Sequence, residues 1–229
     1  MREIILDIET TGLNKDEDRI IEIGCVEVYN KIPTENVFHT FINPAGVKVS
    51  EGAVQIHGIT DEKLKDAPKF EEIVPEFLQF IAQANIIAHN ASFDIGFINK
   101  EFDRLLMPPI EAKRIIDTLA IARKKYPLGP NNLDALCRRF NIDNKKRTLH
   151  GALLDAQLLA EVYIELHGGR QKEFDLLNEK KIIEKQEKSI VQYRKIPLKS
   201  RITEEDKAKH RAFIDKMIKD ALWNNYDET

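Results

Sequence analysis

Residues 5–12 read ILDIETTG, a hydrophobic run that two carboxylates, Asp7 and Glu9, interrupt. Residues two apart in a β-strand project from the same face, about 6.7 Å from each other. The stretch therefore predicts a strand with two acids side by side near its end. The surrounding Ile and Leu residues are typical of a buried strand, so the two charges need an explanation. One interpretation is an edge strand whose acids face water, and the other is a binding site at a strand end in a helix-covered sheet.

The segments around this stretch predict an α/β domain whose sheet mixes antiparallel and parallel pairs. Three strands come first and two more alternate with helices, and Pro75 should kink its helix or delay the start. The expected strands are 4–9, 20–29, 37–42, 86–88 and 115–116, and the expected helices are 70–81, 93–102, 118–124, 133–140 and 151–166.

Composition predicts a soluble globular protein of 229 residues, 42% hydrophobic and 32% charged. No apolar run approaches the roughly 20 residues of a membrane-spanning helix. The chain enters its first strand at once, which leaves no room for a secretory signal. Cys25 and Cys137 lie in apolar stretches outside any CxxC motif, so we expect buried, reduced thiols and a cytoplasmic location.

The net charge of −3, with a sequence pI of about 6.1, gives the chain no basic excess. Proteins that hold nucleic acid through their own electrostatic field usually carry such an excess. Either nucleic acid is not the ligand, or something else holds that ligand near the protein.

Three further polar residues lie at the ends of expected helices. Asp94 is at or near a helix start, where an acid also suits the helix dipole. His150 and Asp155 are five residues apart, so their side chains would diverge by about 140° if both were helical. They converge only if His150 lies in the loop before the helix; alternatively, His150 is a solvated loop residue.

Four carboxylates and one histidine at the ends of elements are explained more simply together than separately. Clustered carboxylates repel one another and must bind protons or cations. Oxygen ligands without a Cys or His cluster favour Mg²⁺ or Mn²⁺ over zinc. The sequence thus predicts a divalent metal site, with these members: Asp7, Glu9, Asp94, Asp155 and, beside them, His150.

Three motifs resemble, in order, those of the DEDDh branch of the DEDD exonuclease superfamily: DIETTG at 7–12, HNASFD at 89–94 and HGALLD at 150–155. Other stretches are similar to the epsilon proofreading subunits of bacterial DNA polymerase III. These are IIEIGCVEV at 20–28, QIHGITDE at 55–62, NNLDALC at 131–137 and IDNKKRTLHGALLDAQLLAEVY at 142–163. The resemblance covers about residues 1–169 and continues more weakly through the tail.

The resemblance implies a ribonuclease H-like fold and a 3′→5′ exonuclease that removes mispaired 3′-terminal nucleotides from DNA. Two divalent ions, Mg²⁺ or Mn²⁺, would support the hydrolysis. His150 would accept the proton of the attacking water, since its ordinary pKa leaves it mostly neutral at physiological pH. The residues that would hold the ions are Asp7, Glu9, Asp94 and Asp155.

The resemblance also implies contacts with the terminal nucleotide. His57 and the preceding loop would make them, the matching loop position being Gly52, where relatives often carry Glu. The neighbouring Glu51 is an alternative contact, and His57 is otherwise a structural turn residue. The implied nucleotide-contacting residues are Asp7, Glu9, Gly52, His57 and Asp155.

The tail predicts partner binding. We expect an exonuclease domain at 1–169, a linker at 170–202 and a helical tail at 203–229, in which Thr203 begins an amphipathic helix. The resemblance implies that 203–223 bind the polymerase (alpha) subunit and that QKEFDL, 171–176, binds the sliding clamp. Tethering to the polymerase would replace a basic DNA-binding surface. Alternatively, the helix packs on its own domain and the hexapeptide match is due to chance.

Two other functions remain open from the sequence. One is an RNA 3′-end trimming exonuclease of the same superfamily, which would use the same catalytic residues. The other is a non-catalytic scaffold subunit of the replication machinery. The tail favours the replicative subunit over the trimming enzyme, and the complete set of motif residues favours catalysis over the scaffold.

Overall fold

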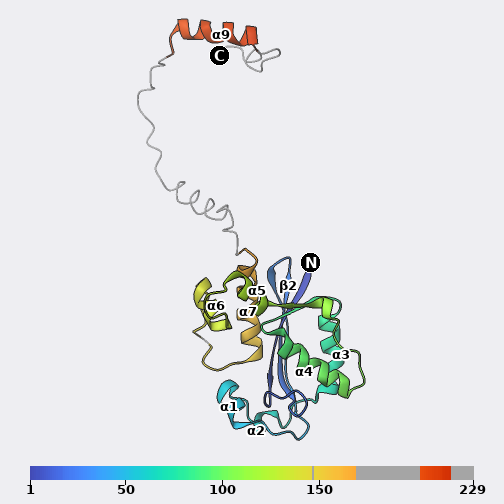
Figure 1. The fold of residues 1–229 in the computed structure, drawn as a ribbon. Helices are drawn as coiled ribbons and strands as arrows, with labels where there is room; N and C mark the ends of the chain where they lie inside the picture. Colours follow the sequence, from blue (N-terminus) through green and yellow to red (C-terminus); the bar gives the residue numbers. More distant parts are fainter. Residues whose placement is uncertain (146, 169–201, 218–229) are drawn as a thin grey trace, which may run out of the picture. The chain divides into compact units, whose positions relative to one another are not determined.

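The structure is a computed structural model that describes residues 1–145, 147–168 and 202–217 (Figure 1). The chain divides into two units, Met1–Phe174 and Asp175–Thr229. The expected clamp-binding stretch 171–176 and the end of the expected tail helix, 218–223, lie outside the described residues. None of the helices within the described residues combines the length and the apolar composition that a membrane span requires.

One mixed sheet consists of β1 (Arg2–Thr10), β2 (Ile20–Tyr29), β3 (Ile32–Phe41), β4 (Asn85–Ala88) and β5 (Ile115–Asp117). The strand order is β3-β2-β1-β4-β5. β1 and β2, and β2 and β3, are antiparallel, whereas β1 and β4, and β4 and β5, are parallel. This topology confirms the expected α/β fold with a mixed five-stranded sheet.

The helices occur where hydrophobic periodicity predicts them, with three short additions, α1, α2 and η1. α3 begins at Phe70, so Pro75 inside it does not delay its start. The helices are α1 (Glu51–His57), α2 (Asp61–Leu64), α3 (Phe70–Ile81), α4 (Ala91–Arg104), the 3₁₀ helix η1 (Ala112–Arg114), α5 (Thr118–Lys125), α6 (Leu133–Phe140), α7 (Ala152–Leu166) and α9 (Glu204–Met217).

β1 is a central strand whose two faces contribute to different cores. Ile4, Leu6 and Ile8 pack with α3 and α4, whereas Ile5 packs with α5, α6 and α7. Figure 1 shows these two groups of helices on opposite sides of the sheet. Because side chains alternate along a strand, Asp7 lies on the face of Ile5, the face that α7 covers.

Two segments differ from expectation. β3 begins at Ile32 and not at residue 37, because Asn30 and Lys31 both have positive φ angles, 51° and 66°, and return the chain directly onto β2. β3 is an edge strand with mostly exposed side chains, so it lacks the alternation that reveals a half-buried strand. The expected loop before His57 is the short helix α1.

The described part of the second unit is α9. Its start agrees with the expectation, because Thr203 Oγ1 accepts a hydrogen bond from the Asp206 backbone amide (3.2 Å) while the Thr203 amide donates to Asp206 Oδ2 (3.0 Å). This reciprocal pair satisfies amides at the helix start. Of the expected apolar stripe, Ile214 and Met217 fall within the described helix and the rest lies beyond it.

Candidate active site

The C-terminal half of β1 carries Asp7 and Glu9. Asp7 lies opposite Gly24 of β2, and Glu9 lies opposite Glu22. Since β1 has a neighbour on each side, the interpretation of these acids as members of an edge strand is wrong. They occupy the face that α7 covers, beyond the point where Ile5 ends the apolar packing on that face.

Asp94 stands in the first turn of α4, directly after β4. Asn90, at the N-cap, has a left-handed conformation (φ 69°) that turns the chain from strand into helix. Asp94 is 4% exposed, and its burial raises its pKa to about 8. Hydrogen bonds from the backbone of Asp94 and Ile8 oppose this shift, whereas the charge of Glu9 adds to it. The first and second motifs therefore meet.

His150 and Asp155 bring the third motif to the same place. His150 precedes α7, and Asp155 is in the first turn of that helix, 2% exposed. His150 Nδ1 lies 3.1 Å from Asp155 Oδ2, and this hydrogen bond raises the pKa of His150. Burial alone would raise the pKa of Asp155, but hydrogen bonds from Arg147 and His150 lower it. His150 is thus a loop residue that converges on a helical acid.

β2 fixes the position of α7. A methyl group on Gly24 would lie 2.3 Å from the backbone of Ala152 and Leu153, so only glycine permits this approach of helix and strand. Two residues earlier in β2, Glu22 Oε2 accepts a hydrogen bond from the Ala152 amide (3.1 Å). The acid satisfies one of the free amides at the start of α7. Close packing and a buried carboxylate together hold Asp155 above β1.

The acids of this cluster raise one another's pKa values. Burial, followed by the charges of Asp94 and Asp155, raises the pKa of Asp7 well above its ordinary value. Burial also raises the pKa of Glu9 to about 7, and Asp155 contributes. Such mutual effects require proximity. The structure therefore places in one cluster, which we call the acidic site, these side chains: Asp7, Glu9, Asp94, His150 and Asp155.

The acidic site fits a divalent cation. Ligand atoms of Glu9, His150 and Asp155 all lie within 4.8 Å of one another. Nearby are the buried Asp94 and the half-buried Asp7, whose raised pKa values show repulsion within the cluster, so a bound cation would favour the ionised forms. Carboxylate oxygens are the ligands that Mg²⁺ and Mn²⁺ prefer.

The two remaining residues expected to contact the nucleotide, His57 and Gly52, are placed differently. His57 ends α1 beside the acidic site: the His150 amide donates to the Ile56 carbonyl (3.1 Å), and burial lowers the pKa of His57. His57 Nδ1 accepts from the Ile59 amide (3.0 Å). Gly52 lies in the first turn of α1, exposed, and a methyl group placed on it would meet no atom within 4 Å.

Two further residues, Arg147 and Glu22, contact the elements of the acidic site, a role that the three motifs do not predict. Arg147 belongs to a polar stretch that predicts only a loop, yet its guanidinium pairs with Asp155 and with Asp134 of α6. A signal existed for Glu22, since an acid between isoleucines in a buried strand needs a partner. Arg147 carried no such signal, because its partners are 8 and 13 positions away in sequence.

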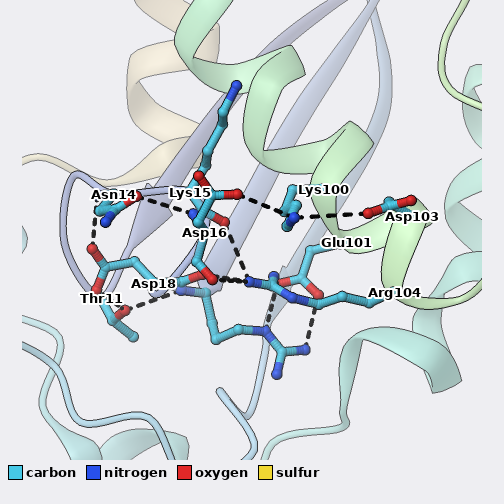
Figure 2. Close-up of polar contacts among 10 residues, drawn as sticks. Thr11, Asn14, Lys15, Asp16, Asp18, Lys100, Glu101, Asp103 and Arg104 are labelled. Carbon is cyan, nitrogen blue, oxygen red and sulfur yellow. Dashed lines mark hydrogen bonds and ion pairs between the residues drawn. The ribbon is translucent and has the colours of Figure 1, made fainter.

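An ion-pair network holds the β1–β2 loop against α4 (Figure 2). The buried Glu101 accepts two hydrogen bonds from Arg19 (2.7 and 2.8 Å) and one from Arg104 (2.9 Å). Arg104 also donates to the carbonyls of Lys15 and Asp18 in the loop. This loop follows β1, which carries Glu9, and α4 carries Asp94, so the network joins the elements of the first two motifs.

Comparisons with known proteins agree with this geometry. The family model described as exonuclease matches residues 4–163. The chain is 46% identical over 224 residues to the DNA polymerase III subunit epsilon of Rickettsia typhi, an alignment that covers 95% of this chain and 97% of that protein. It is 49% identical over 177 residues to the subunit of the same name from Escherichia coli, covering 74% and 72% of the two chains.

Solved structures show the same fold. Exonuclease X in complex with 5′ overhanging duplex DNA superposes with a TM-score of 0.56 at 27% identity, over 72% of this chain and 90% of that one. The nuclease domain of 3′hExo, a DEDDh family member bound to rAMP, superposes with a TM-score of 0.64 at 17% identity, over 73% and 92% of the chains. The second similarity supports the fold alone.

Proposed function

The chain belongs to the exonuclease family and, within it, to the epsilon subunits of DNA polymerase III, and from this membership we propose how its acidic site works. The protein is a 3′→5′ proofreading exonuclease, as the sequence predicts. We assign a role in the hydrolysis that releases a mispaired 3′-terminal nucleotide from DNA to each residue of the acidic site.

The convergence of four acids and one histidine from three distant segments carries this proposal. Three of the acids, Asp7, Glu9 and Asp94, have raised pKa values, which describes a cluster that needs cations. The DEDDh family depends on divalent metal. We assign the binding of two ions, Mg²⁺ or Mn²⁺, to Asp7, Glu9, Asp94 and Asp155. When bound, such ions supply charge stabilisation to the attacking and leaving oxygens.

His150 would act as the general base. Its side chain is partly exposed, and its Nδ1 hydrogen bond to Asp155 orients the ring. A histidine held by a carboxylate in this way can accept the proton of the attacking water and pass it to solvent. Hydrolysis would then break the bond between the phosphorus and the 3′ oxygen and release a 5′-mononucleotide.

The terminal nucleotide would lie between β1 and the end of α1. We assign contacts with it to Asp7, Glu9, Gly52, His57 and Asp155. The side chain of His57 supports this assignment. Its buried Nε2 has no hydrogen-bond partner of good geometry among the described residues and is therefore available to a ligand, although the Thr10 backbone partly offsets the fall in the pKa of the ring that burial causes. A mispaired end frays more readily than a paired one, by about a few kcal/mol, so selectivity needs no reading of bases.

The protein binds DNA and works in a polymerase complex, as its family does. We propose a finer arrangement: residues 1–169 as the exonuclease domain, 170–202 as a linker and 203–229 as the tail. In this arrangement 203–223 bind the polymerase alpha subunit and 171–176 bind the sliding clamp. The location would be the cytoplasm. Tethering of this kind supplies a high local concentration of primer ends to a protein whose net charge is −3.

A primer-digestion assay tests the proposal. The purified chain is incubated with two primer–templates that differ only in a paired or mispaired 3′ end, with Mg²⁺, with Mn²⁺ or with a chelator. We expect release of 5′-mononucleotides with either metal, faster from the mispaired end, and none with chelator. Absence of release with metal would favour a scaffold subunit, and faster digestion of structured RNA would favour an RNA-trimming enzyme.

A further inference from the structure

Arg147 contacts two residues of the acidic site, although it is not one of the residues that the three motifs assign to that site. Its Nε and Nη2 donate to the two oxygens of Asp155 (2.6 and 2.7 Å), in a bidentate ion pair. Nη2 also lies 2.8 Å from His150 Nδ1, and Nη1 lies 2.8 Å from Asp134 Oδ2. The side chain is only 7% exposed. One guanidinium therefore joins the third motif to α6.

These contacts use the oxygens that a metal ion would need. Each oxygen of Asp155 already accepts a charge-assisted hydrogen bond, and Asp155 is one of three residues whose ligand atoms gather within 4.8 Å. A carboxylate shared by a guanidinium and a divalent ion brings two cations to within a few ångströms, where they repel strongly in a buried environment. Arginine does not lose its proton to relieve this repulsion.

The geometry points to Arg147 as a tethered cation that occupies Asp155 when metal is absent and competes with metal for it. The guanidinium neutralises one acid of the cluster and, through Asp155, holds the loop that precedes α7 against that helix. Asp134 is the second carboxylate that pairs with the guanidinium, and it accepts a hydrogen bond from Asn144 Nδ2 (2.9 Å). This second ion pair would keep the guanidinium close when Asp155 binds a metal ion. This inference rests on the proposed function, because it assumes metal at Asp155.

Three variants of the full chain, compared with the wild type, test this competition. Mn²⁺ affinity is measured by electron paramagnetic resonance of the free ion, and unfolding temperature is measured with chelator and with Mn²⁺. Arg147→Gln removes the charge, and Arg147→Lys keeps it but loses the bidentate pair. Arg138→Gln removes a charge from an exposed position on the same helix as Asp134 and serves as the control.

We expect Arg147→Gln to bind Mn²⁺ about tenfold more tightly than the wild type, because a competing charge at contact distance is gone. Its unfolding temperature should fall in chelator and recover with Mn²⁺. Arg147→Lys should bind about two- to threefold more tightly, and Arg138→Gln should stay within about twofold of the wild type.

A folded Arg147→Gln that binds Mn²⁺ equally or less tightly would overturn the inference, because a purely structural role weakens the site. If that variant does not fold, Arg147→Lys decides the question, and an affinity no tighter than that of the wild type overturns the inference. Failure of the wild type to bind Mn²⁺ would instead contradict the metal site of the proposed function.

Discussion

A buried carboxylate costs stability unless a proton, a cation or hydrogen bonds neutralise it. Asp155 pairs with Arg147, whereas Asp7, Glu9 and Asp94 have raised pKa values, which favour their protonated forms. These residues therefore lower the stability of the fold at neutral pH, and in the proposed function the same carboxylates would hold the metal ions. Stability and function are opposed at single residues.

Replacing Asp7 by alanine distinguishes its effect on stability from its effect on catalysis. We expect Asp7→Ala to reduce nucleotide release by at least about a thousandfold, because charge stabilisation at a metal site contributes several kcal/mol. Its unfolding temperature in chelator should be equal to or higher than that of the wild type, since a half-buried acid that neighbouring acids repel is gone. Asp66→Ala, at an exposed position, is the control and should change neither quantity. A large drop in the unfolding temperature of Asp7→Ala would contradict this account.

The pH dependence of stability follows from the same pKa shifts. Glu9 and Asp94 have pKa values of about 7 and about 8 in the folded protein, above their ordinary values of 4.5 and 3.8. Between these limits the folded state binds more protons than the unfolded state, so stability is full at low pH and is lost as pH rises through the folded pKa values. Thermal unfolding in chelator should show a midpoint that falls as pH rises from about 5 to about 9. Excess Mg²⁺ should flatten this decline, and a midpoint that rises in chelator would refute the assignment.

At the scale of elements, the site depends on how closely α7 approaches β2. The backbone of Ala152 and Leu153 lies where any side chain on Gly24 would be. A helix that must move away from the sheet carries Asp155 and the His150 loop with it. The distance between one strand and one helix thus controls the geometry of the third motif.

Gly24→Ala should therefore damage folding and the site together. We expect the free energy of unfolding to fall by about 3 kcal/mol or more, as when a core is overpacked, and Mn²⁺ binding to weaken. Gly96→Ala is the matched control: a methyl group there meets only Lys15 Cδ at 3.7 Å, and alanine favours a helix, so stability should be equal or higher. Chemical denaturation measures both variants, and wild-type stability in Gly24→Ala would show that the helix can shift without cost.

The network around Glu101 links α4 to the β1–β2 loop (Figure 2). Glu101→Gln should lower the free energy of unfolding by about 3 kcal/mol, because two partly buried guanidinium groups lose their counter-charge. Asp103→Asn, on the same helix but 75% exposed at its side chain, should cost less than about 0.5 kcal/mol. Denaturant titration distinguishes them, and equal effects would mean that the network contributes no more than a surface ion pair.

At the scale of the whole molecule, every member of the acidic site belongs to the first unit, Met1–Phe174. Its sheet, both groups of covering helices and the three motifs are complete without the second unit. Catalysis and partner binding should therefore be separable along the chain.

A chain shortened to residues 1–174 tests this separation. We expect it to release nucleotides from a mispaired primer within about twofold of the full chain, since no site residue is removed. It should not co-elute with the polymerase alpha subunit in size-exclusion chromatography, whereas the full chain should. Co-elution of the shortened chain would place the polymerase-binding surface on the exonuclease domain.

The sequence by itself determined the α/β class, the succession of strands and helices along the chain and the acids of the three motifs. The degree of burial can be predicted from the local sequence. Apolar runs indicate β1 and β2, helical spacing of apolar residues indicates α3, and an acid is easily recognised within an apolar run. The need for His150 to precede α7 also followed from helix geometry alone.

Only the tertiary structure decided which charges meet. Glu22 accepts a hydrogen bond from the start of α7, 130 residues away in sequence, and Arg147 joins α6 to Asp155. Distances between packed elements, and not positions in sequence, select hydrogen-bond and ion-pair partners. The first half of the edge strand β3, residues 32–36, and the helix α1 were likewise hidden, since exposed segments have little hydrophobic periodicity to reveal them. Local patterns record how much each residue is buried, whereas long-range packing determines what it is buried against.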